Sequence, residues 1–531
     1  MIEYYRLGGA TMKENKNAYN FKKFFKQHKS TILILLLLFI LLLEILLTII
    51  YEYNVYTVDK MNSDFAGDTI FAKNLAEEGK LIFSKNWYPT TELYVVHHQL
   101  IMTPLFYIFD DYRLVTTISA GIAFILLACT FYYFLKTLNC SKIKSLLILV
   151  LIFNPVNYFL HAFAILFQGY LFYVILQILY ITLILRLLHK TLNKVELLLF
   201  YIISFCIGMC GIRLFIILYV PLVLLLLLEN LNWKLDKNAL KDKKNLLVLG
   251  TFLTSIIAYL IYTMYLCPKY SFDGNIAMFG LDNTNINSNI LHIIPSFLDS
   301  IGFSISNIAI KSMQFIIQAI KLLFWLLIIV ENIYLAFFNK ERTIAKIIAK
   351  FNILCIIVTL GSMILTSDTF VESSRYIGLS CFLLMPTSLA NIKKPDLKIK
   401  SILIYALIIV TILVGFVQYI TEIKKCGTID NERDGYISFL DKGNYKFGIA
   451  TYWNANITTF LSKNQIEIMP IDSPDNLEIF RWNTKKSYQE LEPEFLILTS
   501  SELKDLNTNS YESQIVYEDD NYVVIDFRKE G

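Results

Sequence analysis

The sequence predicts an all-α membrane protein: a bundle of about eleven transmembrane helices, with amphipathic helices in the first outer loop and a small α/β domain at the C terminus. Hydrophobic residues make up 56% of the 531 residues and charged residues only 17%, whereas an ordinary soluble protein carries roughly 25% charged residues. The mean hydropathy is +0.53. Long apolar runs recur along residues 31–422, so the lipid bilayer is the predicted solvent of this part of the chain.

The predicted spans are apolar runs of about 20 residues. The first, Thr31 to Tyr51, is too long for a signal-peptide core and lacks a small-residue cleavage site, so we interpret it as a retained span. The run Val195 to Glu229 is too long for one helix, and Gly208, Gly211 and Pro221 divide it in two. The other spans are predicted near 114–135, 145–160, 165–188, 196–211, 213–229, 246–266, 313–338, 347–366, 376–391 and 401–421.

The distribution of basic residues predicts the orientation, because Lys and Arg are retained on the cytoplasmic side in short loops. The N-terminal arm, residues 1–30, and alternate loops after it are basic, whereas the first opposite loop, residues 52–113, is acidic. The arm is therefore expected in the cytoplasm, and an odd number of spans places the C terminus outside. The net charge of +4 excludes the broad basic surface that binds nucleic acid.

The first outer loop and the C-terminal segment are expected to fold outside the membrane. Helical spacing of apolar residues predicts surface helices near 68–80 and 97–109. Residues 430–531 read as an α/β domain, with Asn454 expected to cap a helix that extends to Lys463. This domain lacks a glycine-rich phosphate loop or metal-ligand spacing, so catalysis by the domain alone is not expected. Its strands are predicted near 446–451, 465–471, 495–499, 515–517 and 522–527, with a hairpin tip at Asp519, Asp520 and Asn521.

The stretch Ser63-Asp64-Phe65-Ala66-Gly67-Asp68, soon after the first span, resembles the C-type glycosyltransferases. This superfamily includes the protein O-mannosyltransferases and the aminoarabinose transferase of lipid A. Phe65 departs from the acidic second residue of the family and Asp68 from its aromatic residue. The segments 87–93 and 109–111 also look like those of bacterial members. The matching places are occupied by Asp64, Ala66, Ala72, Gly79 and Pro104-Leu105-Phe106.

The resemblance implies an inverting glycosyltransferase that takes a sugar from a polyprenyl phosphate and passes it to an acceptor outside the cytoplasm. The acceptor would be a cell-envelope polymer, a lipid or a protein. The loop aspartate of the family removes the proton of the acceptor hydroxyl. We carry this role to Asp64, with Asp68 as a substitute because it lies one helical turn later. The alternative is that either aspartate caps a helix that begins near Thr69.

The donor that the resemblance implies carries a phosphate, which needs cationic partners. Arg213 and Arg375 lie at the outer ends of predicted spans, where a lipid headgroup would sit. Interfacial anchoring explains such arginines equally well. Lys321 lies inside a span, where charges are costly and often functional, and could also reach the phosphate.

Further candidates for substrate contacts lie in the outer segments. Glu92, His97 and His98 resemble a metal site only loosely, because adjacent histidines on a helix do not share a face. A solvated or substrate-contacting role is expected instead. His161 and Gln168 flank a short outer turn and could contact sugar hydroxyls, although interfacial placement explains them as well. The sequence identifies no cofactor and leaves a divalent metal open.

Two other classes of function remain open from the sequence. In a transporter or flippase of lipid-linked or envelope components, the same spans would form a translocation path and the acidic loop a substrate gate. The two halves show no matching pair of broken helices, which disfavours transport. The other alternative is a membrane scaffold whose outer domain binds a partner. Membrane lipids are the expected surroundings in every case.

Overall fold

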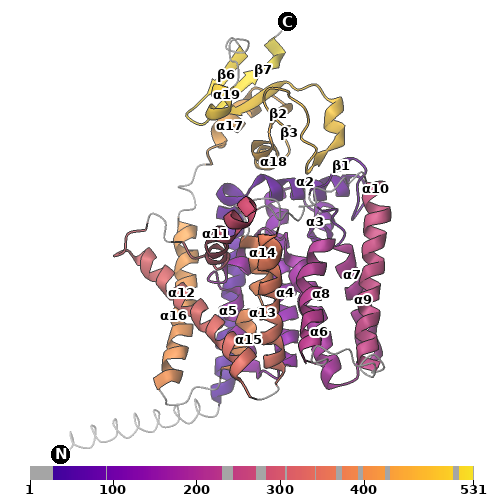
Figure 1. Cartoon of the computed structure of the whole chain (residues 1–531). Helices are drawn as coiled ribbons and strands as arrows, with labels where there is room; N and C mark the ends of the chain where they lie inside the picture. Colours follow the sequence, from indigo (N-terminus) through magenta and orange to yellow (C-terminus); the bar gives the residue numbers. More distant parts are fainter. Residues whose placement is uncertain are drawn as a thin grey trace, which may run out of the picture.

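The computed structural model describes residues 28–90, 92–229, 243–270, 283–304, 308–340, 343–365, 374–392, 399–424, 431–505 and 514–529. Long helices form a bundle, and a domain that contains most of the strands sits at one end of it (Figure 1). Two short helices, α2 (Ser63–Glu77) and α3 (Gln99–Phe106), lie at this end of the bundle, beneath the domain. The architecture of a helical bundle with a small C-terminal sheet domain at one end agrees with the sequence prediction.

Seven helices in the described part of the chain are long and apolar enough to cross a membrane, and each coincides with a predicted span. The first runs from His28 to Lys60 and ends in a π-helical segment, η1 (Glu52–Lys60). The others contain α4 (Tyr112–Thr137), α6 (Leu171–His189), α9 (Lys243–Ile261) with η4 (Tyr262–Leu266), α12 (Met313–Ile333) with η5 (Tyr334–Phe338), α13 (Ile344–Ile364) and α16 (Ile399–Lys424).

The remaining predicted spans coincide with shorter helices, so the count of eleven spans is not confirmed. One of them, α5 (Lys142–Phe153), ends early because Asn154, the residue before Pro155, takes an extended backbone. The chain then continues as η2 (Leu160–Leu166). The other short helices are α7 (Lys194–Met209), α8 (Ile212–Glu229) and the interrupted pair α14 (Ser374–Cys381) and α15 (Leu384–Asn391).

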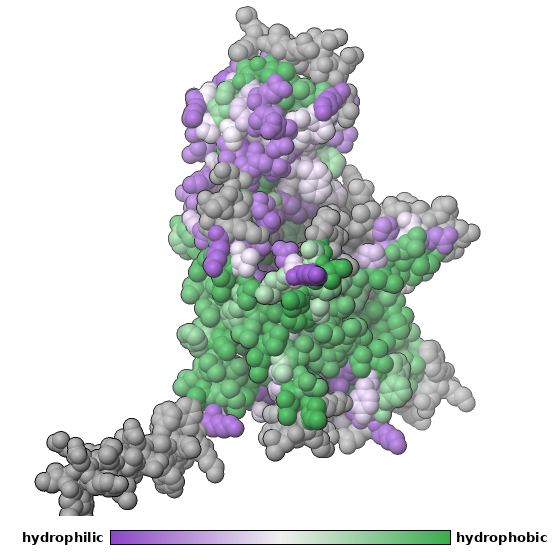
Figure 2. All heavy atoms as spheres, turned by 90° about the vertical axis from the view of Figure 1, so that its left-hand side faces the viewer, coloured by the Kyte–Doolittle hydropathy of each residue, from purple (hydrophilic) through white to green (hydrophobic). Residues whose placement is uncertain are grey.

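The outer surface of the bundle is apolar. Figure 2 shows a hydrophobic surface over the helices, below the hydrophilic surface of the sheet domain. Large exposed apolar side chains on one face of a helix are stable in lipid and unfavourable in water. On α9, α12 and α16 they include Leu249, Leu253, Ile257, Leu323, Leu326, Val330, Leu403, Ile409 and Leu413.

Helix α2 in the first outer loop is enclosed by protein rather than exposed on the membrane surface. It begins at Ser63, several residues before the expected start near Asp68. Its buried residues lie on several faces, because α2 packs on α3 on one side and on α18 (Tyr452–Leu461) of the sheet domain on another. The second loop helix, α3, is shorter than the predicted 97–109 segment.

The sheet domain has the five strands that the sequence predicted. The order across the sheet is β3-β2-β5-β7-β6, in which β2 is parallel to β3 and β5 and the other neighbours are antiparallel. Asp519, Asp520 and Asn521 connect β6 to β7, as expected of a hairpin tip. The elements are α17 (Asp434–Lys442), β2 (Phe447–Thr451), β3 (Glu467–Ile471), η6 (Lys486–Glu490), β5 (Phe495–Thr499), α19 (Ser500–Asp505), β6 (Ile515–Glu518), β7 (Tyr522–Asp526) and η9 (Phe527–Lys529).

The expected asparagine cap in this domain is wrong. Helix α18 begins at Tyr452, so Asn454 lies inside its first turn. The Asn454 Oδ1 atom accepts a hydrogen bond from Arg433 at 3.0 Å instead of bonding the helix start. Arg433, which directly precedes α17, therefore bonds the side-chain oxygen that a helix cap would use.

A small second sheet joins the first outer loop to the domain, which the sequence analysis did not predict. Strand β1 (Trp87–Tyr88) pairs antiparallel with β4 (Thr484–Lys485). Next to this pair, Asn86 Nδ2 donates to Ser487 Oγ at 3.0 Å, and Ser487 N donates to Asn86 Oδ1 at 2.8 Å. The loop and the domain thus form one continuous outer layer over the bundle.

The orientation predicted from the basic loops has a direct test. A cysteine introduced at the exposed Glu492 of the sheet domain should react with a membrane-impermeant maleimide in intact cells, because the domain is expected outside. A cysteine at Lys142, in a basic loop, should react only after lysis. The reverse pattern would invert the proposed topology.

Candidate active site

A pocket of about 80 Å³ lies between the first outer loop, the outer-layer ends of several bundle helices and the sheet domain. Its lining combines a carboxylate of α2, two arginines and a group of aromatic rings. Three of the sequence-predicted residues from the loop and both predicted arginines contribute to the wall. The lining residues are Asp64, Thr90, Glu92, Tyr94, His97, Phe167, Gly169, Tyr170, Tyr173, Arg213, Arg375, Tyr376 and Trp482.

Asp64 is presented to the pocket by the first turn of α2. The cap of this helix is Asn62, whose side chain accepts a hydrogen bond from Phe65 N at 3.0 Å. Neither Asp64 nor Asp68 caps a helix, so the capping alternative from the sequence is wrong. Because Asn62 already accepts the hydrogen bond at the start of the helix, the Asp64 carboxylate is available for other contacts.

The sheet domain holds Asp64 in place from above. The Tyr452 hydroxyl donates to Asp64 Oδ1 at 2.5 Å. Burial, together with the negative charge of Asp64, raises the pKa of Tyr452, so this phenol stays protonated as a donor. In addition, Ser63 Oγ donates to the Tyr452 carbonyl at 2.5 Å, which ties the two backbones together.

The domain approaches α2 closely because of a glycine. A Cβ atom at Gly67 would lie 2.5 Å from Nδ2 of Asn483 and 2.6 Å from Nδ2 of Asn456. The space is used by Asn483, whose Nδ2 atom donates to the Asp64 carbonyl and to Asp68 Oδ1, both at 3.0 Å. Gly67 therefore permits one side chain of the domain to fix the backbone that carries both aspartates.

Asp68 occupies a different environment from Asp64. Its side chain is buried, it does not line the pocket, and burial raises its pKa, helped by the nearby charge of Asp64. Its second oxygen, Oδ2, faces His98 Nε2 at 3.7 Å. Of the two candidates for the base, only Asp64 contacts the cavity.

Arg213, near the start of α8, is held in the pocket wall by a network of first-loop and α6 side chains. Its Nε atom lies 3.4 Å from Glu92 Oε1, and its Nη1 atom donates to the Tyr170 hydroxyl at 3.3 Å. The Tyr173 hydroxyl donates to the other Glu92 oxygen, Oε2. Glu92 thus positions Arg213 and neutralises part of its charge.

Arg375 and Arg213 both lie close to the ring of Tyr376. The guanidinium carbons of Arg375 and Arg213 are 5.4 Å and 4.8 Å from the centroid of this ring. The buried Nε atom of Arg375 has no hydrogen-bond partner. A guanidinium with an unused donor at a pocket wall is suited to an anion.

The two adjacent histidines have separate surroundings. His97 lines the pocket, stacks on Tyr94 with ring centroids 3.7 Å apart, and bonds the Gly169 carbonyl through Nε2 at 3.0 Å. Burial lowers the pKa of His97 to about 3 and holds the pKa of His98 well below its ordinary value. Both residues precede the first turn of α3, so the helical-face argument against a shared ligand does not apply to them.

The structure does not bring the remaining predicted residues into the pocket, because each has a partner in the bundle. Lys321 donates to the Gly302 carbonyl at 3.3 Å. His161 bonds the Tyr419 hydroxyl. Gln168 Oε1 accepts from Ser119 Oγ of α4 at 2.5 Å. We leave these three residues out of the proposed site.

Sequence reasoning missed the contribution of the sheet domain. Tyr452 reaches Asp64 from 388 residues away, and Trp482 lines the same pocket. The cluster Phe480-Arg481-Trp482-Asn483 lies in a segment for which the sequence predicted no strand, and its composition does not indicate a contact with the first loop. The domain forms one wall of the pocket.

The capping role of Asn62 predicts a stability effect without loss of the carboxylate. Asn62→Ala should lower the free energy of unfolding by about 1 kcal/mol, seen as a reduced melting temperature of the purified protein. Asn521→Ala, at the hairpin tip, is the control and should change stability by less than about 0.5 kcal/mol. Equal effects of the two substitutions would contradict the cap.

Comparison with solved structures identifies the fold. ArnT from Cupriavidus metallidurans bound to undecaprenyl phosphate is similar over 92% of this chain and 97% of its own, with a TM-score of 0.56 and 9% identity. The archaeal oligosaccharyltransferase AglB from Archaeoglobus fulgidus, in complex with an inhibitory peptide and a dolichol-phosphate, is similar over 90% of this chain and 70% of its own, with a TM-score of 0.48 and 11% identity. No protein-family model and no curated protein sequence matches the chain. The likeness to ArnT shows that this multi-pass membrane protein shares the fold of ArnT, in agreement with the membrane architecture that the first-loop resemblance implied.

Proposed function

We propose that the protein is a membrane glycosyltransferase that moves a sugar from a polyprenyl phosphate to an acceptor in the cell envelope. The observation that carries the proposal is that Asp64, Arg213 and Arg375 line one pocket. A carboxylate and paired guanidinium groups are the side chains that this reaction needs at its two ends. The shared fold with ArnT, whose structure contains undecaprenyl phosphate, supports a lipid-linked donor.

The arginines are the proposed site of the donor phosphate. Guanidinium groups bind phosphate oxygens in a fixed, often bidentate geometry. Arg375 has a buried donor nitrogen without a partner, and Arg213 is oriented toward the cavity by Glu92 and Tyr170. As the bond between the anomeric carbon and the phosphate oxygen breaks, the phosphate becomes the leaving group and its added charge is stabilised by both cations.

Asp64 is the proposed base at the other end of the reaction. An acceptor hydroxyl attacks the anomeric carbon from the face opposite the phosphate, its oxygen forms the new glycosidic bond, and its proton passes to the carboxylate. The product then has the inverted anomeric configuration, and polyprenyl phosphate is released. The hydrogen bond from Tyr452 fixes the orientation of Asp64, so one carboxylate oxygen is held while the carboxylate takes the proton.

The sheet domain is the proposed acceptor side of the site. Trp482 lines the pocket beside Asp64, and Phe480 lies next to both Trp482 and Tyr452, with ring centroids 6.3 Å and 5.4 Å away. These rings are partly exposed except for Tyr452, which is buried. An acceptor that approaches from the outer side therefore meets aromatic surface before it reaches the carboxylate.

The test is transfer of label by the purified, reconstituted protein. Radiolabelled sugars on polyprenyl phosphate are supplied with a cell-envelope fraction, and label is followed from lipid to non-lipid or new lipid products. The proposal predicts protein-dependent transfer from at least one donor. If label crosses the vesicle membrane without leaving its original lipid, the protein is a transporter or flippase and the proposal is wrong.

A further inference from the structure

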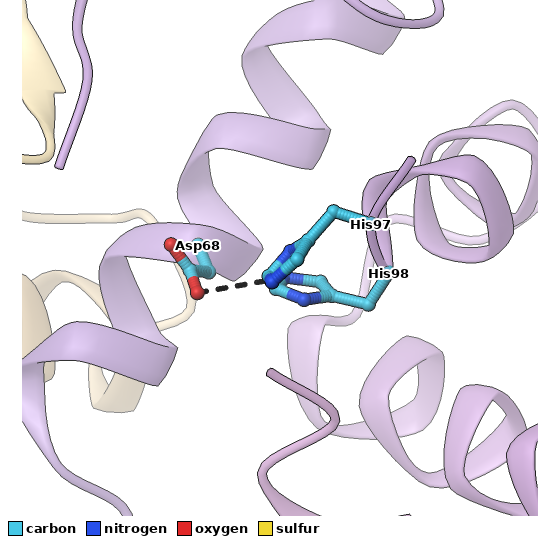
Figure 3. A group of neighbouring side chains, drawn as sticks. All are labelled: Asp68, His97 and His98. Atoms are coloured by element: carbon cyan, nitrogen blue, oxygen red, sulfur yellow. Dashed lines mark ion pairs between the residues drawn. The ribbon is translucent and has the colours of Figure 1, made fainter. Parts of the chain in front are cut away.

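One carboxylate and two imidazole side chains, each with an atom able to bind a metal ion, lie close together behind the wall of the pocket. Asp68 from α2 and the adjacent His97 and His98 at the start of α3 each offer one donor atom, and these atoms all lie within 4.8 Å of one another. In Figure 3 the carboxylate and both imidazole rings point toward a common centre. All three side chains are buried, with exposed fractions of 1% for Asp68, 4% for His97 and 1% for His98.

The hydrogen bonds around the cluster leave its ligand atoms unused. His97 Nε2 bonds the Gly169 carbonyl at 3.0 Å. A carbonyl only accepts, so this nitrogen carries the proton and the buried Nδ1 keeps its lone pair, without a partner. The Nδ1 atom of His98 is also buried and without a partner. A buried polar atom without a partner calls for an explanation, and a bound ion is one.

A hydrogen bond to one of its carboxylate oxygens orients Asp68. Asn483 Nδ2 donates to Asp68 Oδ1 at 3.0 Å, which leaves Oδ2 toward the histidines. The separation of Oδ2 from His98 Nε2 is 3.7 Å, too long for a hydrogen bond. Asp68 and His97 thus show the arrangement of metal sites in proteins, in which a second hydrogen bond holds the ligand and fixes a histidine's tautomer.

We propose that Asp68, His97 and His98 bind a divalent first-row transition metal, with Zn²⁺ favoured. Two imidazoles and one carboxylate suit zinc, whereas magnesium and calcium prefer oxygen ligands. In a tetrahedral zinc site the ligand atoms lie about 3.3 Å apart. Rotation of the three side chains would shorten the present separations of their ligand atoms, which are within 4.8 Å, to this distance. A fourth ligand would come from water.

The ion would support the site rather than take part in the reaction. Asp68 and His98 do not line the pocket, and Asp68 lies one helical turn after Asp64 on α2. A metal there fixes α2, the start of α3 and Asn483 to one another, and so fixes the backbone of the proposed base. The metal proposal rests on the cluster alone and does not depend on the transferase activity.

Metal content of the purified full-length protein tests the proposal. Wild-type protein should contain about one equivalent of zinc per chain by inductively coupled plasma mass spectrometry. Asp68→Asn and His98→Asn should reduce this content at least tenfold. His161→Asn, a change of a buried histidine elsewhere, is the matched control and should keep the metal.

A second measurement covers variants that do not fold. Wild-type protein stripped with a chelator should gain melting temperature when Zn²⁺ is added, because a ligand that binds only the folded state stabilises it. Mg²⁺ should give no shift. Wild-type protein that is purified without bound metal and shows no shift with Zn²⁺, Mn²⁺ or Co²⁺ would overturn the proposal, whatever its transferase activity.

Discussion

Asp64→Asn should reduce the rate of sugar transfer by about a hundredfold to ten-thousandfold, because loss of a general base has effects of this size. Asparagine keeps the shape of the side chain and can still accept the Tyr452 hydrogen bond through its amide oxygen. The protein should therefore stay folded and inserted at normal levels. Initial rates with a saturating donor, together with the melting temperature, measure the two effects separately.

Asp110→Asn is the matched control, since this aspartate is in the same loop and its side chain is 95% exposed in an ion pair with Lys73. Its transfer rate should equal that of the wild type. Asp68→Asn should reduce the rate less than Asp64→Asn, because Asp68 does not contact the cavity. If Asp64→Asn keeps full activity while Asp68→Asn abolishes it, Asp68 is the base and the family correspondence is displaced by one helical turn.

Arg375→Gln should lower kcat/KM for the lipid-linked donor by about 10- to 150-fold, the equivalent of a lost hydrogen bond to a charged group. A substitution of Arg375 disturbs fewer neighbouring contacts than a substitution of Arg213. Its buried Nε has no partner, whereas removal of Arg213 would also leave Glu92 without its cation. Donor-concentration series with the purified protein give the value directly.

Arg528→Gln, in the sheet domain, serves as the control for loss of one arginine and should leave kcat/KM unchanged. Arg375→Lys should fall between the wild type and Arg375→Gln, because lysine keeps the charge but not the planar donor pair. Unchanged donor kinetics in Arg375→Gln would remove this residue from the phosphate site and leave interfacial anchoring as its role.

The fold could be predicted well wherever a local pattern sets the structure. The strands of the C-terminal domain are short, mostly apolar runs, and the turn at Asp519 to Asn521 lacks apolar residues altogether, so β6 and β7 were found without tertiary information. The spans were less certain, because hydropathy predicts one continuous run over 145–160 although its helix stops at Phe153. Composition does not record the helix end that Asn154 and Pro155 impose.

Prediction of the site was limited by contacts between distant segments. Asp64, Glu92 and His97 lie in one loop, and the arginines lie at span ends, so motif and position were enough to select them. Nothing local indicates that residues of the sheet domain, Tyr452, Trp482 and Asn483, meet this loop, since their partners are about 400 residues away.

Polar residues within apolar runs were the least reliable candidates. Lys321 was selected because a charge inside a span is costly and often functional, and His161 and Gln168 were selected because they flank a short outer turn. In the structure each is satisfied by a nearby backbone or side-chain group of the bundle. The sequence does not distinguish a polar group that serves packing from one that faces a cavity.

The measurement that tests the central claim most directly is the structure of the protein with undecaprenyl phosphate bound. The account predicts phosphate oxygens within hydrogen-bond distance of both Arg213 and Arg375, in the same pocket as Asp64. A different result would place the phosphate at the other end of the bundle, for example beside Lys244 at the cavity of about 280 Å³ between α6, α8 and α13. A headgroup bound there, with the arginines unoccupied, would contradict the proposed donor site.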